Sequence, residues 1–447
     1  MSPKSARKPR AQKHARRPPK TRKIRRSALE EYKESISQDG VLEVMSLEDD
    51  NCLSTVRGWV STGSVELDLL LNGQGIPLGR VVEIIGPEHI GKSTLLDQIF
   101  ANVQRMGGVA VLAEPEISRD RAYSTRLGVN TRDLQYLQFA REEFVLERIF
   151  STFMRTIDWW AEHHPGTPVV IGLDALAGTA THSEMMAGVD VQEKKKKKGK
   201  SAQSAPKKDE GEDQPKETKT QKGGDQPGEA AKYLARVARQ LPVRLGGTQI
   251  SVVILNHEYS RVGMTGMGPK NESYGGKALR RMASIRLRLY PAGEWLEAGG
   301  RKVGRVVVAR LEKNRLGNPW GEAYLPVVSG YGIDNCWSVC HGLERAGMTV
   351  KSGSWQSFNL AGEVYRFQGW TGFSALMAEH PELFPQLVGI YRERMLPLLT
   401  AVQAGPPSLT GASVTPPPVE TPVPSVEQEK EEEDDPGSPE TEPEKEG

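Results

Sequence analysis

The segment Gly86-Pro-Glu-His-Ile-Gly-Lys-Ser-Thr94 matches the phosphate-loop pattern GxxxxGK[ST]. An apolar run, Val81-Val-Glu-Ile-Ile85, precedes it, and a helical pattern, Leu95-Leu-Asp-Gln-Ile-Phe100, follows it. A strand, a loop and a helix in this order point backbone N–H groups and the positive end of a helix at an anion. The segment therefore predicts a nucleotide site, in which Lys92 reaches the β- and γ-phosphates and Ser93 ligates Mg²⁺. A glycine-rich turn without a ligand is the alternative, and the flanking pattern argues against it.

The charge of the chain is concentrated at its two ends. The 447 residues carry a formal net charge of only +2, but residues 1–26 hold twelve Lys and Arg and no acid. Residues 420–447 hold twelve Asp and Glu against two Lys. A basic arm and an acidic tail suggest a nucleic-acid partner. Solvated ends without a specific partner are the alternative for each tail.

The composition also limits the compartment. Three cysteines, Cys52, Cys336 and Cys340, fit a reducing compartment without a disulfide framework. Two cysteines four residues apart do not complete a structural zinc site, so Cys336 and Cys340 are expected to be buried thiols. No stretch approaches 18 apolar residues, and residues 1–26 lack the apolar centre of a secretory signal. We therefore expect a cytoplasmic protein with no membrane contact.

Three stretches are too polar to form a core, and we expect them to be disordered: residues 1–26, 188–228 and the Pro-rich acidic tail from about residue 398 or 404 onward. Between them, four short apolar runs predict the strands of a parallel sheet: Val81–Ile85, Val109–Leu112, Val169–Leu173 and Ile250–Leu255. Helical patterns such as Phe144–Trp159 and Ala230–Leu241 supply the crossovers.

The pattern changes later in the chain. Ser284–Leu289 alternates with period two, and Val303–Leu311 forms a second apolar run, which predicts an antiparallel extension of the sheet. A small lobe is expected at residues 337–397. The fold class is therefore α/β, with a mostly parallel central sheet around a phosphate loop.

Two carboxylate positions complete the predicted nucleotide site. Asp174 follows the strand Val169–Leu173, where P-loop enzymes place an Asp that helps to hold Mg²⁺. Glu114 and Glu116 follow the strand at Val109–Leu112, and either could deprotonate a water beside a γ-phosphate. Their residue types alone do not decide between the two, and surface carboxylates without a role are the alternative.

The chain resembles the bacterial RecA recombinase family from about Ala28 to about Val388. The resemblance is carried by five segments in order and spacing: Ser61–Asp68, Gly79–Glu88, Tyr123–Val129, Gly275–Leu279 and Glu312–Arg315. It implies a RecA-like P-loop ATPase core, with an N-terminal oligomerisation helix and a small C-terminal α/β lobe. The implied domains are an oligomerisation segment at 27–60, the core at 61–336 and the lobe at 337–397.

The resemblance also implies roles for single residues. Glu116 matches the catalytic Glu, which favours it over Glu114. Asp120 and Tyr123 match the residues that contact and stack on adenine. Lys313 and Arg315 match a cationic pair that reaches the nucleotide of the neighbouring subunit. The expected nucleotide-binding set is therefore the loop together with the two adenine contacts: Gly86, Pro87, Glu88, His89, Ile90, Gly91, Lys92, Ser93, Thr94, Asp120 and Tyr123.

Two further elements resemble DNA-binding parts of the family. Lys232, Arg236 and Arg239 share one face of a predicted helix, which suits phosphate oxygens. A basic solvated face without a ligand is the alternative. The stretch Glu258–Tyr274, with Tyr259 and Arg261, resembles the family's mobile loop for single-stranded DNA. Gly275 and Gly276 would let the backbone approach a phosphate.

The chain departs from the family at two places. His257 stands where the family usually has a Gln that senses the γ-phosphate, and an imidazole can still donate a hydrogen bond. The insert 188–228 falls within the other DNA-proximal loop. Its lysines would add salt-dependent phosphate contacts, or the insert is a solvated loop without a role.

The sequence thus predicts an ATP- and Mg²⁺-dependent recombinase of the cytoplasm and nucleoid. It would polymerise with copies of itself on single-stranded DNA, pair it with double-stranded DNA, and act in DNA repair and the SOS response, with recombination mediators as possible partners. The main alternative is a RecA-like accessory protein that binds DNA or a partner without strand exchange. A RecA-like ring helicase is a third class.

Overall fold

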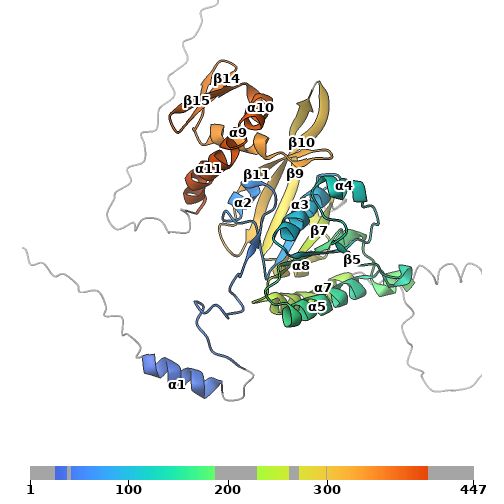
Figure 1. Cartoon of the computed structure of the whole chain (residues 1–447). Coiled ribbons are helices and arrows are strands. Elements are labelled where there is room, and N and C mark those ends of the chain that lie inside the picture. Colours follow the sequence, from blue (N-terminus) through green and yellow to red (C-terminus); the bar gives the residue numbers. More distant parts are fainter. Residues whose placement is uncertain (1–25, 38–41, 187–228, 261–270, 299, 401–447) are drawn as a thin grey trace, which may run out of the picture. The chain divides into compact units, whose positions relative to one another are not determined.

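The computed structural model describes residues 26–37, 42–186, 229–260, 271–298 and 300–400 (Figure 1). The basic arm before residue 26, the 188–228 insert and the acidic tail beyond residue 400 lie outside these ranges. The predictions of disorder for them therefore stay predictions.

A ten-stranded sheet forms the centre of the fold (Figure 1). Nine strands follow the order β12-β11-β10-β9-β3-β7-β6-β4-β5, and β8 pairs with β7 outside this path. The strands are β3 (Val81–Gly86), β4 (Val109–Ala113), β5 (Gln135–Tyr136), β6 (Val169–Leu173), β7 (Ile250–Ser260), β8 (Asn271–Ser273), β9 (Ile285–Ala298), β10 (Arg301–Asn314), β11 (Glu322–Val328) and β12 (Gly332–Ile333).

The sheet has a parallel and an antiparallel part. The strands β5, β4, β6, β7, β3 and β9 run parallel to one another, and β9, β10, β11 and β12 pair antiparallel. All four predicted parallel strands form, and the predicted antiparallel extension is confirmed. The strand predicted to end at Leu255 continues to Ser260, because its outer part pairs with β8.

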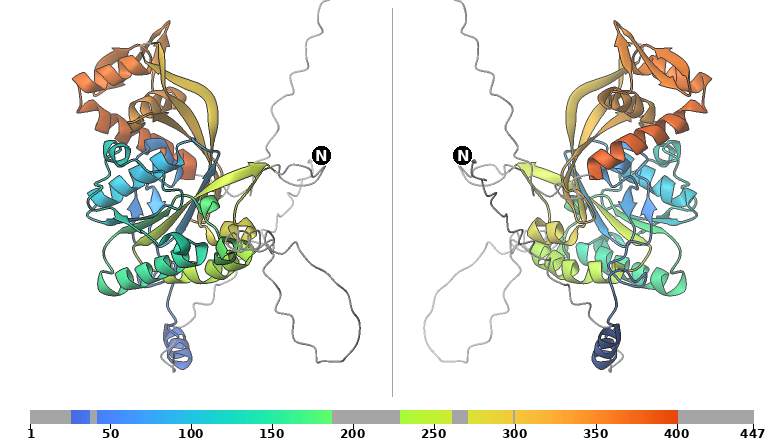
Figure 2. Two further views of the ribbon diagram at one scale, coloured as in Figure 1. Left: turned by 90° about the vertical axis from the view of Figure 1, so that its right-hand side faces the viewer. Right: turned by 90° about the vertical axis from the view of Figure 1, so that its left-hand side faces the viewer.

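Helices cover both faces of the sheet. The helices before the C-terminal lobe, of which α1 does not pack on the sheet, are α1 (Arg26–Ile36), α2 (Val65–Leu70), α3 (Lys92–Arg105), α4 (Arg121–Arg126), α5 (Leu146–His163), α7 (Glu229–Leu245) and α8 (Gly276–Met282), with short 3₁₀ turns at Arg141–Glu143 and Leu176–Gly178. The predicted helices at 144–159 and 230–241 correspond to α5 and α7. Figure 2 shows these two helices side by side.

Alternate residues of the buried strands reach opposite faces. In β3, Val82 and Ile84 join the core under α3, whereas Val81 joins the core under α5 and α7. In β4, Leu112 likewise joins the core under α3, and Val111 joins the core under α5 and α7. Because both faces are covered, these strands are nearly continuous in apolar residues, and this is the pattern by which the sequence predicted a parallel sheet.

A buried network of charged groups crosses the middle of the sheet. Glu83 of β3 is fully buried and accepts a hydrogen bond of 2.5 Å from Nε of Arg286 on β9. The same guanidinium donates to Glu312 of β10 at 3.0 Å and to the Ser273 hydroxyl of β8 at 3.3 Å. Asn256 of β7 donates to Glu83 at 2.9 Å. Each charge therefore has a partner, as buried ions require.

The C-terminal lobe combines helices with a small sheet. It contains α9 (Asn335–Arg345), α10 (Gly369–Glu379), α11 (Leu383–Thr400) and the antiparallel strands β13 (Val350–Ser352), β14 (Trp355–Leu360) and β15 (Glu363–Phe367). Its hydrophobic core includes Val65 and Leu69 of α2, which connect the lobe to the part of the chain that holds the central sheet. A two-stranded sheet, β1 (Trp59–Val60) with β2 (Ile76–Pro77), flanks α2.

The cysteines are free thiols. Cys340 of α9 is buried, and burial raises its pKa to about 12, while Cys336 and Cys52 are partly exposed. The expectation that Cys336 would be buried is therefore met only in part. Within the described ranges, none of the helices is long and apolar enough to cross a membrane.

We expect Arg286→Met to destabilise the protein by about 3–5 kcal/mol, because it leaves Glu83 as a buried charge without its cation. Urea unfolding followed by circular dichroism measures this change. The double variant Glu83→Gln/Arg286→Met removes both charges and should recover part of the loss. A single variant as stable as the wild type would contradict this role of the network.

Candidate nucleotide-binding site

The phosphate loop connects the buried end of β3 to the first turn of α3. Gly91 precedes the helix with a φ of +98°, a left-handed conformation that glycine adopts at little cost. Its neighbour in the loop, His89, also has a positive φ, of +55°. The turn leaves the first N–H groups of α3 without helical partners, so that they are available to an anion.

Lys92 lies folded into this loop. Its side chain is buried, and Nζ donates to the carbonyl oxygens of Gly86 at 3.0 Å and Pro87 at 2.7 Å. Burial lowers the pKa of Lys92, and the nearby carboxylates of Asp174 and Glu116 act in the opposite direction. The acceptors of this ammonium group are neutral carbonyl oxygens, and a bound phosphate would supply a negatively charged partner.

A cavity of about 800 Å³ opens at the loop. It brings together most of the residues predicted from sequence: Glu88, His89, Ile90, Gly91, Lys92, Ser93, Thr94, Glu116, Tyr123, Asp174 and His257. Gly86 and Pro87 do not line it, but their carbonyl oxygens accept hydrogen bonds from Lys92, which does. The convergence follows from topology, because the carboxyl ends of β3, β4, β6 and β7 meet at one edge of the sheet.

The structure separates the two candidate bases. Glu114 is 2% exposed and accepts hydrogen bonds from the Ser118 N–H at 3.2 Å, the Ser118 hydroxyl at 3.1 Å and the Tyr136 hydroxyl at 3.2 Å. Burial raises the pKa of Glu114. Glu116, in contrast, lines the cavity and its side chain is 39% exposed. Only Glu116 has an oxygen free to meet a water molecule in the cavity, so the geometry favours it as the base.

His257 links this carboxylate to the phosphate loop. It lies on β7 opposite Gly86 in the parallel register with β3. Its Nε2 is 3.4 Å from Oε1 of Glu116, and its Nδ1 is 3.5 Å from Nζ of Lys92. An ammonium group only donates hydrogen bonds, so Nδ1 is the acceptor and a neutral ring carries its proton on Nε2, facing Glu116.

Ser93 and Asp174 offer the oxygen donors that Mg²⁺ prefers. Ser93 is exposed to the cavity on the first turn of α3, and Asp174 follows β6. Oδ2 of Asp174 accepts a hydrogen bond of 2.9 Å from Arg119, so Oδ1 is the oxygen that this contact leaves for a metal ion. The donor set fits the ion. In the part of the chain that the structure describes, no group of three His, Cys, Asp or Glu forms a further metal site.

The residues predicted to contact adenine begin α4. Asp120 caps this helix, and its carboxylate accepts the N–H groups of Ala122 at 3.0 Å and Tyr123 at 3.1 Å. The Tyr123 hydroxyl is 3.0 Å from Oγ1 of Thr94, which fixes the ring beside the phosphate loop. A carboxylate has about four acceptor positions, so Asp120 retains capacity for a ligand.

Sequence reasoning missed several residues that line the same cavity, among them a tryptophan and two cations. Trp295, Lys302 and Arg305 come from the β9–β10 hairpin. Arg305 donates to the His89 carbonyl, and the Lys302 ammonium lies 4.5 Å from the Trp295 ring centre. The strand pairing shifts register between residues 302 and 304 and between 305 and 307. Such bulges re-aim side chains and have no signature in the sequence.

Lys313 and Arg315 do not line the cavity of their own chain. Lys313 donates to the carbonyl oxygens of Arg280 at 2.7 Å and Ala283 at 2.5 Å, and Arg315 donates to Arg281 at 2.9 Å. Both cations therefore sit at the C-terminal end of α8, where the helix dipole favours positive charge. Burial and the charge of Arg315 lower the pKa of Lys313 to about 8.

Comparisons with known proteins agree with this geometry. A family model described as the RecA N-terminal domain matches residues 24–158 and 214–334. Protein RecA of a Thermus thermophilus strain is 31% identical over 335 residues, which cover 75% of this chain and 85% of that protein. Protein RecA of Thioalkalivibrio sulfidiphilus is 29% identical over 364 residues, which cover 81% of this chain and 92% of that protein.

The chain belongs to the RecA family. Its α/β fold with a mostly parallel central sheet is the RecA-like core that the sequence predicted. The unmatched residues between 158 and 214 include β6 and much of the charged insert at 188–228.

The predicted DNA face of this RecA-family core lies on α7. Lys232, Arg236 and Arg239 are exposed, while Leu234 and Val237 on the opposite face are buried. The three cations therefore share a solvent-facing stripe, as their spacing predicted. Whether they bind DNA stays a prediction.

The glycines after the predicted DNA loop have different surroundings. Gly275 begins α8 with a φ of +81°, and a Cβ there would come within 2.9 Å of Leu234 of α7. Gly276, with a φ of +59°, faces open space. Tyr259 belongs to β7 and pairs with Glu272 of β8. Arg261 lies outside the described residues.

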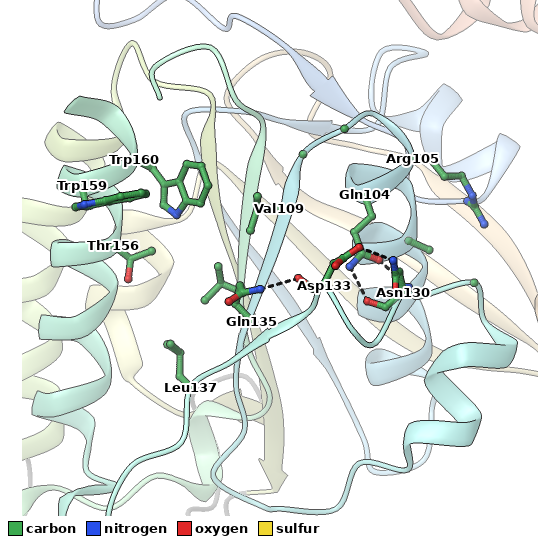
Figure 3. Close-up of a pocket in the computed structure, with 15 residues that line it drawn as sticks. Gln104, Arg105, Val109, Asn130, Asp133, Gln135, Leu137, Thr156, Trp159 and Trp160 are labelled. Atoms are coloured by element: carbon green, nitrogen blue, oxygen red, sulfur yellow. Dashed lines mark hydrogen bonds between the residues drawn. The ribbon is translucent and has the colours of Figure 1, made fainter. Parts of the chain in front are cut away.

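A second cavity, of about 910 Å³, lies away from the phosphate loop (Figure 3). The end of α3, the strands β4 and β5, and Trp159 and Trp160 of α5 surround it. It contains none of the predicted nucleotide residues, so cavity size alone would have led to the wrong site.

We expect Glu116→Gln to bind nucleotide but to hydrolyse it about 10²-fold or more slowly, because an amide cannot take a proton from water. Glu114→Gln keeps the same shape at a buried position and should leave hydrolysis close to the wild-type rate. The rate of phosphate release under saturating ATP measures hydrolysis by both variants. Normal hydrolysis by Glu116→Gln together with slow hydrolysis by Glu114→Gln would reverse the assignment.

The pH dependence of Lys313 gives a second expectation. Its ammonium group loses a proton as the pH rises through its pKa of about 8. If its charge assists hydrolysis, kcat/KM should therefore fall as the pH rises above about 8. Lys313→Arg stays charged and should retain activity to higher pH. Identical pH profiles of the wild type and Lys313→Arg would exclude Lys313 as the titrating group.

Proposed function

We propose that this protein is an ATP-dependent recombinase that polymerises on single-stranded DNA and promotes homologous pairing and strand exchange. The observation that supports it best is the convergence of Lys92, Glu116, Asp174 and His257 on one cavity at the phosphate loop. Lys92 begins the helix after β3, Glu116 and Asp174 follow β4 and β6, and His257 lies on β7, and these four strands are neighbours in the sheet. Membership of the RecA family supports the same reaction class.

The residues of this site suit hydrolysis of a bound nucleoside triphosphate. The loop N–H groups and Lys92 would hold the phosphates, while Tyr123 and Asp120 would hold the base. Bound Mg²⁺, held by Ser93 and Asp174, would neutralise phosphate charge. Glu116 would orient a water molecule and accept its proton. His257 would keep Glu116 in place through Nε2 and contact Lys92 through Nδ1.

A single chain does not complete this site. Lys313 and Arg315 lie at the end of α8, outside the cavity of their own chain. We propose that they act on the nucleotide of an adjacent subunit, where two cations would stabilise charge on the transferring phosphoryl group. Hydrolysis would then require a filament or another assembly of copies.

DNA would be coupled to this site through α7 and α8. The cationic stripe of α7 is backed by Leu234, which packs closely on Gly275 at the start of α8. The other end of α8 holds Lys313 and Arg315. A contact of DNA with α7 could therefore change the position of the two cations through one short helix.

The experiment that tests the proposal is ATP hydrolysis with and without single-stranded DNA across a salt series. We expect strong stimulation by DNA that fades as salt rises, because phosphate contacts release counterions. Lys92→Ala is the control and should abolish nucleotide binding or turnover. Unchanged hydrolysis by this variant would contradict the assigned site. Hydrolysis that is indifferent to DNA would favour the accessory protein over the recombinase.

The DNA stripe has its own test. Replacing Lys232, Arg236 and Arg239 with Ala should reduce the slope of log affinity against log salt by about 2, as expected for three lost phosphate contacts to a single strand. Fluorescence anisotropy of a labelled oligonucleotide measures the slope. The matched control replaces three exposed arginines in and beside α5: Arg141, Arg148 and Arg155. Equal slopes for both triple variants would rule out a specific role of the stripe.

A further inference from the structure

One arginine lies between three carboxylates at the edge of the nucleotide site. The Arg119 guanidinium donates to Asp97 of α3 through Nη1 and to Oδ2 of Asp174 through Nη2, the latter at 2.9 Å. Its Nε lies 3.8 Å from Oε2 of Glu114. The side chain of Arg119 is 10% exposed, and those of Asp97, Glu114 and Asp174 are 2%, 2% and 10% exposed. The four groups thus form a compact cluster that solvent screens little.

The position of Arg119 connects the parts of the site. It lies three residues after Glu116 and directly before Asp120, which caps α4. Asp97 is held in turn by the Ser124 hydroxyl at 2.8 Å. The guanidinium therefore joins the segment that carries the candidate base to α3 and to the end of β6. Sequence reasoning assigned Arg119 no role, because its partners are 22 and 55 residues away in the chain.

The contact with Asp174 has a consequence for the metal. A guanidinium at hydrogen-bond distance takes one oxygen of this carboxylate and offsets its charge. A divalent cation held by Asp174 would share this carboxylate with a fixed positive charge, close to it and in a poorly solvated place. Like charges at such a distance repel strongly.

We propose that Arg119 sets the Mg²⁺ requirement of the nucleotide site, because Arg119 and Mg²⁺ compete for the carboxylate of Asp174. This proposal rests on the proposed function, since it takes the cavity to be a Mg²⁺–nucleotide site. Arg119 is then a positioning residue: it holds Asp174 in place before the metal arrives and weakens the hold of Asp174 on the metal afterwards.

A purely structural role of Arg119 predicts a different result. If the guanidinium only neutralised Asp97 and Glu114, its removal would weaken folding and leave the intrinsic affinity for Mg²⁺ unchanged or reduced. Competition predicts that removal of the charge tightens Mg²⁺ binding. The sign of the change therefore separates the two roles.

The test is a Mg²⁺ titration of the full chain with a fluorescent methylanthraniloyl derivative of ATP, in which nucleotide binding rather than turnover is read. Arg119→Gln should lower the Mg²⁺ concentration at half-saturation by about tenfold or more, as expected for loss of one nearby charge. Arg121→Gln, an exposed neighbour on α4, is the matched control and should behave as the wild type. An unchanged or higher half-saturation concentration for Arg119→Gln would overturn the proposal.

A second variant reads the competition in the opposite direction and serves if Arg119→Gln does not fold. Asp97→Asn removes one charged partner of Arg119 and should strengthen its contact with Asp174, so that the Mg²⁺ concentration at half-saturation rises. The absence of a rise overturns the proposal. A wild-type protein that does not bind the ATP derivative, as Lys92→Ala should not, overturns the proposed function as well. Normal wild-type binding with unshifted variants overturns the Arg119 proposal alone.

Discussion

The backbone hydrogen bonds between β3 and β7 set the geometry on which the nucleotide site depends. Their parallel register places Gly86, where the phosphate loop begins, opposite His257. Because β6 continues the parallel order beyond β7, Asp174 emerges at the same edge of the sheet, and Glu116 follows from β4. A shift of β7 by one residue would turn His257 away from the loop and place Asn256 or Glu258 opposite Gly86.

Buried charges tie this edge of the sheet to more distant parts of the core. Glu83 lies directly below the phosphate loop on β3, and Arg286 connects it to β8 and β10. Arg288 extends the network from Glu312 toward Glu258 of β7. Ion pairs of this kind stabilise little compared with apolar residues, but removal of one partner leaves a buried charge uncompensated, which is costly. We infer that the network fixes the relative positions of the strands that carry the nucleotide residues.

The cations assigned to the nucleotide site lie at two separate places on one chain, and this separation bears on assembly. Lys92 lies in the cavity, whereas Lys313 and Arg315 are held by backbone carbonyls at the end of α8. A site that receives part of its positive charge from another copy is active only when copies are aligned. This arrangement would link the chemistry of each site to polymerisation and would limit hydrolysis by free subunits.

The sequence by itself determined the elements that depend on local patterns. The phosphate loop, the four parallel strands, α5, α7 and the antiparallel extension follow from glycine spacing and hydrophobic periodicity, which are properties of neighbouring residues. The cationic stripe of α7 follows from helical spacing for the same reason. Only the tertiary structure showed that Glu114 is buried while Glu116 lines the cavity, placed Arg119 between Asp97 and Asp174, and brought Arg305 to the phosphate loop. These outcomes depend on contacts between residues far apart in the chain and on strand bulges, and neither leaves a periodic signal in the sequence.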